Sequence, residues 1–85
     1  MQAIIKTMVY KKTNIYTKGV KTVVYVSGIT CNGFPIYSTD RNKAKRFEMP
    51  EATKAAYLWN NALLYVAENN GETIQQDEMH TVETP

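Results

Sequence analysis

Apolar residues form two different patterns along this chain, and the pattern changes near its middle. In residues 3–10 and 20–27, β-branched and aromatic side chains dominate and leave apolar groups on both faces of an extended chain, which is typical of strands. Between residues 51 and 66, apolar positions recur instead at steps of three and four, which indicates one face of an α-helix. The pattern predicts a sheet from the first half of the chain and a helix from the second.

Turn signals divide the first half further. Asn32 and Gly33 both tolerate the positive φ that a type I′ turn needs, so they predict a hairpin that folds residues 29–31 back along residues 34–38. Pro35 has no backbone N–H for the ladder of hydrogen bonds. The third strand is therefore expected at an edge of the sheet, or with an irregular start.

Two helices are expected after the third strand. Asp40 is suited to cap a short helical turn that runs to Ala44. Pro50 is suited to the first position of a longer helix, where no backbone N–H is needed, and Asn70 or Gly71 is suited to end it. One apolar stripe runs along the long helix and consists of Ala52, Ala55, Ala56, Trp59, Leu63 and Val66.

The order of these elements defines the fold class. Residues 72–76 can add a short fourth strand around Ile74 to the predicted sheet. Residues 77–85 are polar and acidic and are expected to form a flexible tail. We therefore predict an α+β protein, with a small antiparallel sheet of three to four strands and one long amphipathic helix packed on one face. Residues 1–76 are expected to form this single domain.

One helix covers only one face of a sheet, so the other face is expected to stand open. Alternation places Tyr10 and Tyr25 on that face, among Lys and Met residues. Tyr and Lys can simply shield an exposed sheet, because their rings and stems are apolar and their tips are polar. The alternative is a binding or dimerisation surface on which the tyrosines are the anchors.

Charge is distributed unequally along the chain. Residues 1–47 hold nine Lys or Arg and one acidic residue, whereas residues 48–85 hold one Lys and seven acidic residues, so a net charge of +2 hides a bipolar molecule. Four cations cluster within six positions, namely Arg41, Lys43, Lys45 and Arg46. They repel one another and need solvent or an anionic partner. These four residues, with Tyr10 and Tyr25, are the predicted partner-binding residues.

The chain has few of the side chains that catalytic and metal sites use. His80 is the only histidine and Cys31 the only cysteine, so one chain can assemble neither a His-based triad, nor a Cys/His metal site, nor a disulfide. The four glycines are too scattered to cradle a phosphate. We expect no enzymatic activity, no catalytic residue, no metal and no cofactor. No apolar run suits a signal peptide or a membrane span, so a cytoplasmic location and no membrane partner are expected.

Three short stretches, residues 37–40, 44–47 and 51–52, carry a resemblance to known proteins. They read Tyr-Ser-Thr-Asp, Ala-Lys-Arg-Phe and Glu-Ala. In this order they resemble the hairpin end, the D-x-x-x-A-x-x-F turn and the helix start of small, mostly uncharacterised phage and prophage accessory proteins. Met49 departs from that pattern, because it cannot cap the helix. The resemblance implies a small inhibitor or modulator of host machinery, of the anti-defence or anti-CRISPR kind, and it assigns no functional residue.

Together these observations predict a non-enzymatic accessory protein in the cytoplasm of a host cell, which binds and modulates or inhibits a host macromolecule. A host protein, such as a defence or nucleic-acid-handling protein, is the first choice of partner. The first alternative is direct binding of nucleic acid by the basic surface and its interleaved tyrosines. The second is a homodimeric structural protein whose open sheet face is self-complementary.

Overall fold

Two long antiparallel strands form the centre of the structure. The computed structural model describes residues 1–11, 20–74 and 78–85, and the side chain of Tyr10 lies outside the described residues. β1 (Gln2–Lys11) pairs with β2 (Val20–Ile29), with Lys6 opposite Tyr25. The remaining elements are β3 (Pro35–Ser38), the 3-10 turn η1 (Arg41–Lys43), β4 (Phe47–Glu48), α1 (Met49–Asn69) and β5 (Thr81–Glu83).

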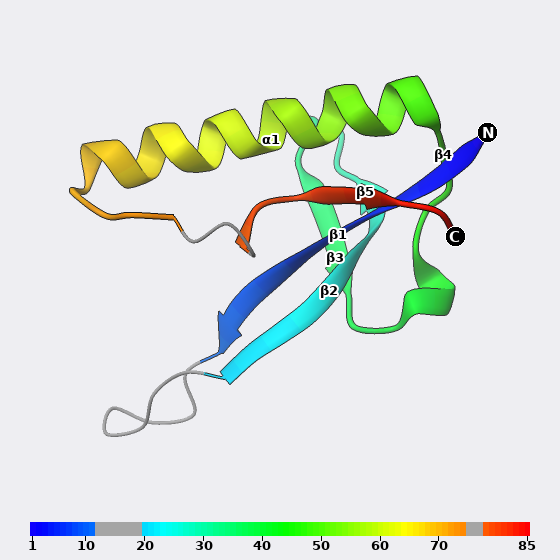
Figure 1. The fold of residues 1–85 in the computed structure, drawn as a ribbon, viewed down its shortest axis with the longest axis horizontal. Coiled ribbons are helices and arrows are strands. Elements are labelled where there is room, and N and C mark those ends of the chain that lie inside the picture. Colours follow the sequence, from blue (N-terminus) through cyan, green and yellow to red (C-terminus); the bar gives the residue numbers. More distant parts are fainter. Residues whose placement is uncertain (12–19, 75–77) are drawn as a thin grey trace.

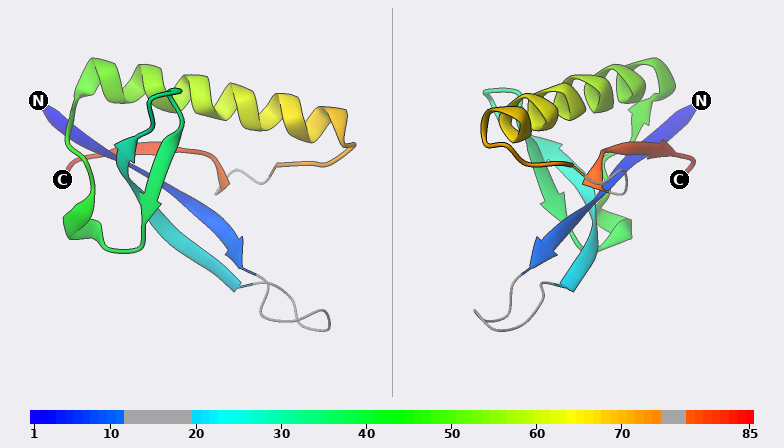
Figure 2. Two further views of the ribbon diagram at one scale, coloured as in Figure 1. Left: turned by 180° about the vertical axis from the view of Figure 1, so that it is seen from behind. Right: turned by 60° about the vertical axis from the view of Figure 1, so that its left-hand side comes forward.

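The fold class is α+β, as the strand-like first half and the helical period of the second half predict. The sheet runs in the order β3-β2-β1-β4, with β5 also paired to β1, and its pairings are antiparallel. β3 lies at one edge, as Pro35 predicts. α1 spans the same side of this twisted sheet in all views (Figures 1 and 2). The core between the two layers consists of Ala3, Ile5, Val26, Phe47, Ala52 and Ala56.

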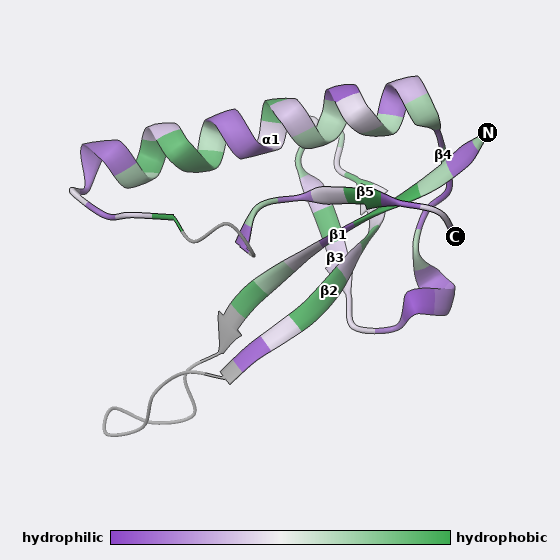
Figure 3. Cartoon of the chain, viewed as in Figure 1, coloured by the Kyte–Doolittle hydropathy of each residue, from purple (hydrophilic) through white to green (hydrophobic). Residues whose placement is uncertain are grey.

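The helix begins and ends where the sequence predicts, and its apolar stripe turns partly away from the sheet. Pro50 occupies the first turn, and Gly71 follows the helix with a φ of 69°. Trp59 is only half-buried, and Val66 is exposed, whereas Ala67 is buried in its place. Apolar and polar bands alternate along the whole length of α1 (Figure 3). Apolar side chains are therefore left on its surface.

The hairpin is present, but its turn is of a different type. The backbone N–H of Gly33 donates to Thr30 O (2.9 Å), and the N–H of Thr30 donates to Phe34 O (2.8 Å). Among the described residues only Gly33 and Gly71 have positive φ, so Asn32 does not take the conformation that a type I′ turn requires. The connection is a longer turn in which Gly33 alone supplies the left-handed residue, with φ of 86°.

The prediction of an open sheet face is wrong in part. Ile4 points away from the helix, yet only 3% of its surface is exposed. The segment around η1 and the C-terminal end surround it, through Arg41, Asn42, Ala44, Arg46 and Pro85. Asp40 caps η1 as expected, because its carboxylate accepts from the Asn42 N–H (2.9 Å).

The prediction of a flexible tail is wrong for residues 78–85. Thr81–Glu83 form β5, which pairs with Ile4, Ile5 and Lys6 of β1. Residues 72–74, by contrast, are not a strand, and residues 75–76 of that predicted strand lie outside the described residues. Because β5 hydrogen-bonds a central strand, the acidic end of the chain belongs to the sheet.

Candidate functional site

The structure brings together two of the predicted binding residues, Tyr25 and Arg41. The Arg41 guanidinium lies over the Tyr25 ring, 5.7 Å from its centroid, and forms an ion pair with the Glu83 carboxylate. It also donates to Thr84 O (3.2 Å). Lys6 pairs with the same carboxylate, at 2.8 Å, and its hydrogen bond is the main reason why the pKa of Glu83 lies below its ordinary value. Part of the basic charge is thus neutralised by β5.

The other three predicted cations are exposed in the segment from η1 to β4. The backbone of Lys45 is fixed, since its N–H donates to Val26 O (2.8 Å), and its ammonium group lies 5.7 Å from the Phe47 ring centroid. Lys43 and Arg46 are exposed beside it. This part of the chain is strongly hydrophilic (Figure 3). It lies at the end of the molecule where both termini lie, far from the C-terminal end of α1 (Figures 1 and 2).

A second candidate site lies between α1, β3 and the segment before β5. Two hollows of about 430 and 330 Å³ adjoin there, and they share Tyr37, Leu63, Ile74 and His80. We call them together the apolar groove. Its remaining lining residues are Thr7, Met8, Val9, Gly33, Phe34, Pro35, Trp59, Ala62, Val66, Ala67, Glu72 and Glu78.

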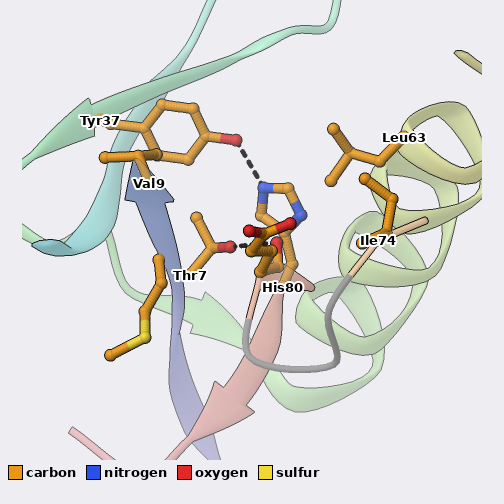
Figure 4. A pocket seen from close by; sticks show the side chains of 8 residues that line it. Thr7, Val9, Tyr37, Leu63, Ile74 and His80 are labelled. Carbon is orange, nitrogen blue, oxygen red and sulfur yellow. Dashed lines mark hydrogen bonds between the residues drawn. The ribbon is translucent and has the colours of Figure 1, made fainter. Parts of the chain in front are cut away.

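His80 lies at the centre of the groove and is held by Asn60. The Asn60 Oδ1 accepts from the His80 backbone N–H (2.6 Å), and its Nδ2 donates to His80 O (3.0 Å). The same Oδ1 lies 3.0 Å from the ring Nδ1 of His80. On the other side of the ring, the Tyr37 Oη lies 2.5 Å from Nε2, and the two side chains point toward each other (Figure 4). Only 5% of the His80 surface is exposed.

These contacts determine the tautomer of His80. A backbone N–H can only donate and a carbonyl oxygen can only accept, so the orientation of the Asn60 amide follows from its backbone partners. The Nδ1 of His80 faces the amide oxygen and must carry the proton. Nε2 is then the acceptor, and the Tyr37 hydroxyl donates to it. The buried side-chain polar atoms of this cluster all have hydrogen-bond partners within the protein.

Burial shifts both titrating groups toward their neutral forms. Desolvation lowers the pKa of His80 below its ordinary value and raises the pKa of Tyr37. A neutral imidazole and a neutral phenol suit an apolar surface. The cluster can therefore hold the groove in shape, and it leaves neither an anionic nucleophile nor a cationic acid at neutral pH.

The rim of the groove is unusually apolar for an exposed surface. The Trp59 Nε1–H donates to Gly33 O (3.1 Å), which ties the helix to the hairpin turn. Beside this contact, Phe34 is 63% exposed and Val66 is 56% exposed. Glu72 also lines the groove. Large exposed apolar side chains that gather around a hollow are typical of binding surfaces.

The apolar groove is not among the sites that the sequence predicts. By sequence, His80 falls in the predicted flexible tail and Phe34 in the returning arm of the predicted hairpin. One local feature of the sequence indicates the exposure of Phe34. This residue directly follows the Asn32-Gly33 turn, where a large apolar side chain is poorly shielded from solvent. The partners of His80 gave no such signal, because Tyr37 is 43 positions away and Asn60 is 20 positions away.

The described residues show neither a metal site nor a membrane-spanning helix. Within the described segments, no group of three or more His, Cys, Asp or Glu side chains gathers as a metal site would require. None of the described helices is both long and apolar enough to span a bilayer. No protein-family model matches this sequence, and comparison with curated proteins and with solved structures finds no match either.

Proposed function

We propose that this chain is a non-enzymatic accessory protein, of the phage or mobile-element kind that its motifs resemble, and that it binds and inhibits a protein of its host. In this proposal the apolar groove is the binding site. Its occupant is a short apolar segment of the partner that also carries a Lys or Arg. The protein acts by covering that segment in the host cytoplasm.

The exposure of Phe34 carries the proposal. An aromatic ring that is 63% exposed, at the rim of a hollow, costs solvation free energy unless a partner covers it. The ring stands on a turn that is fixed by the Trp59 hydrogen bond to Gly33, so it is presented in a defined position. Aromatic side chains, Phe included, are enriched at the cores of protein interfaces, because they bury a large area at a small entropic cost.

Charge at this end of the molecule indicates a basic partner. Glu72 lines the groove, and the last turn of α1 beside it has no basic residue. The unpaired carbonyl groups of a helix C-terminus add partial negative charge. A Lys or Arg next to the apolar segment would therefore be attracted to this rim.

Direct binding of nucleic acid is the second candidate function. Lys43, Lys45 and Arg46 are exposed in one segment, and they present positive charge that a polyanion could contact. Arg41 and Lys6 are less available, because both pair with Glu83. The groove supports the first proposal, whereas these three cations support the second.

A peptide-display selection tests the proposal without knowledge of the host. Random peptides selected on the intact protein are expected to combine bulky apolar residues with Lys or Arg. They should lose binding to the double variant Phe34→Ala/Val66→Ala, because both substitutions remove apolar area from the rim. Losses of about 2 kcal/mol or more are expected for an anchor residue, measured by calorimetry.

The matched control is Ile36→Ala, which removes an apolar group of similar exposure from the neighbouring strand, outside the groove. This variant should bind the selected peptides as the parent does. Peptides that bind all three proteins equally would place the site elsewhere. Submicromolar, salt-dependent binding of a single-stranded oligonucleotide, abolished by Lys43→Glu/Arg46→Glu, would favour the second candidate instead.

A further inference from the structure

The side of α1 that faces away from the sheet carries a second apolar surface, separate from the groove. Tyr57 and Tyr65 are 65% and 68% exposed, and Leu58 and Leu64 are also exposed. Asn61 lies between these two pairs. A helix that packs on a sheet through one side normally presents polar residues on the opposite side. We call this surface the outer face of α1.

The outer face is symmetric about Asn61. Leu58 and Leu64 lie three residues before and after it, and Tyr57 and Tyr65 lie four residues before and after it. Lys54 and Glu68 lie seven residues on either side, in line with Asn61 along the helix, since seven residues are close to two turns. The same apolar residue types thus lie at equal distances before and after Asn61, and the outer face ends in a positive charge on one side and a negative charge on the other.

We infer that the outer face binds a second copy of this chain, in an antiparallel helix pair with its two-fold axis at Asn61. A two-fold axis between antiparallel helices places residues that are equally far from the centre at the same height. Lys54 of each copy then faces Glu68 of the other. In the same way, Leu58 of each copy lies level with Leu64 of the other, and Tyr57 of each copy lies level with Tyr65 of the other.

Charge complementarity identifies the occupant as a second copy. Within one chain Lys54 and Glu68 are about 21 Å apart along the helix, too far for an ion pair. In the antiparallel pair both ends of the interface gain such a pair at once. Asn61 meets its own copy at the centre, and a polar residue within an apolar helix seam is a known device for fixing register.

This dimer differs from the homodimer that the sequence suggested. That alternative used the open face of the sheet, which the η1 segment partly covers through Ile4. The outer face of α1 lies on the opposite side of the helix from the sheet, so the two sheets would lie far apart. The apolar groove stays accessible, because Trp59, Leu63 and Val66 point to other sides of the helix.

A charge exchange tests the register. The single variants Lys54→Glu and Glu68→Lys each replace both intermolecular ion pairs with like charges, and each is expected to raise the dimer dissociation constant about tenfold in sedimentation experiments. The double variant Lys54→Glu/Glu68→Lys restores opposite charges and should return the constant to within about twofold of the parent. A parent protein that stays monomeric at submillimolar concentration overturns the inference, and so does a double variant that stays as weak as the single ones.

A cysteine cross-link tests the axis independently of the charges. Cys31 is exposed and is first replaced, Cys31→Ser. In this background Asn61→Cys places two thiols next to each other across the axis and should give a covalent dimer on mild oxidation. Glu51→Cys is the matched control on the same helix, because its two copies would lie about 30 Å apart. Equal cross-linking of both variants, or none of Asn61→Cys, overturns the proposed axis.

Discussion

Asn60 binds the backbone of His80 through both ends of its side-chain amide. The amide oxygen accepts from the His80 N–H and the amide nitrogen donates to the His80 carbonyl, so one helix residue satisfies both backbone groups of a buried residue just before β5. The C-terminal segment is therefore joined to α1 as well as to β1. This double attachment explains why an acidic segment without periodicity is an ordered part of the fold.

Replacement of Asn60 is expected to release this segment. Asn60→Ala leaves the N–H and carbonyl of His80 without partners in a buried place, which should lower the free energy of unfolding by about 2–4 kcal/mol. Urea denaturation followed by circular dichroism measures this change. Asn69→Ala, an exposed amide at the end of the same helix, is the control and should change stability by less than about 0.5 kcal/mol. Equal midpoints for the two variants would show that the Asn60 contacts do not stabilise the fold.

Stability should depend on pH through His80. Burial lowers the pKa of His80 in the folded protein, whereas the unfolded chain takes up this proton near the ordinary value of 6.5. Between the two values the unfolded state binds more protons, so stability rises with pH there. The contribution of His80 is complete above about pH 6.5 and is lost as the pH falls through the folded pKa.

The measurement is the urea midpoint at a series of pH values from about 7.5 to 5. His80→Gln should flatten this part of the profile, because Gln does not titrate. Glu83 acts in a separate, lower window, since its pKa is lowered from an ordinary value of 4.5, mainly by the Lys6 hydrogen bond. Its contribution is complete above that value and is lost at lower pH. A parent protein with no pH dependence between about 7 and 5 would contradict the role of His80.

Much of the fold follows from local sequence signals. β-branched and aromatic composition predicts β1 and β2, Pro50 and Gly71 predict the ends of α1, and Asp40 predicts η1. Each of these signals lies within a few residues of the feature that it predicts. β5 has no such signal, because it is only three residues long and its partner strand lies at the other end of the chain. Its position depends on long-range pairing, which a local pattern does not report.

The same distinction applies to the candidate sites. Tyr25 is predictable from the two faces of its strand, and the cation cluster of residues 41–46, here called the basic turn, is predictable from charge. The structure places Arg41 over the Tyr25 ring. The apolar groove could not be selected, because its walls come from the hairpin turn, the helix and the segment before β5. The contact that unites them, between Tyr37 and His80, exists only once the sheet has formed.

Removal of residues 78–85 is expected to be severely destabilising. The deletion takes away β5, His80 and the Val82 side chain that packs against the core, and it leaves one edge of β1 without its partner strand. The far-ultraviolet spectrum of the truncated protein should show loss of strand and helix content at 25 °C. Removal of residues 84–85 alone is the control and should preserve the spectrum, because β5 ends at Glu83. A folded protein after the longer deletion would contradict the structural role of β5.

Charge reversal should separate the structural from the exposed cations of the basic turn. Arg41→Glu places a carboxylate against Glu83 and removes the cation over Tyr25, so it should lower the unfolding midpoint in urea. The triple variant Lys43→Glu/Lys45→Glu/Arg46→Glu changes exposed side chains, and the backbone contact of Lys45 with Val26 remains. Its midpoint should stay close to that of the parent.

Any binding of single-stranded DNA by the parent should weaken in the triple variant, with a shallower dependence on salt, because each lost phosphate contact reduces the slope of log affinity against log salt by about 0.7. Equal midpoints for Arg41→Glu and the triple variant would show that Glu83 does not depend on Arg41 as its partner.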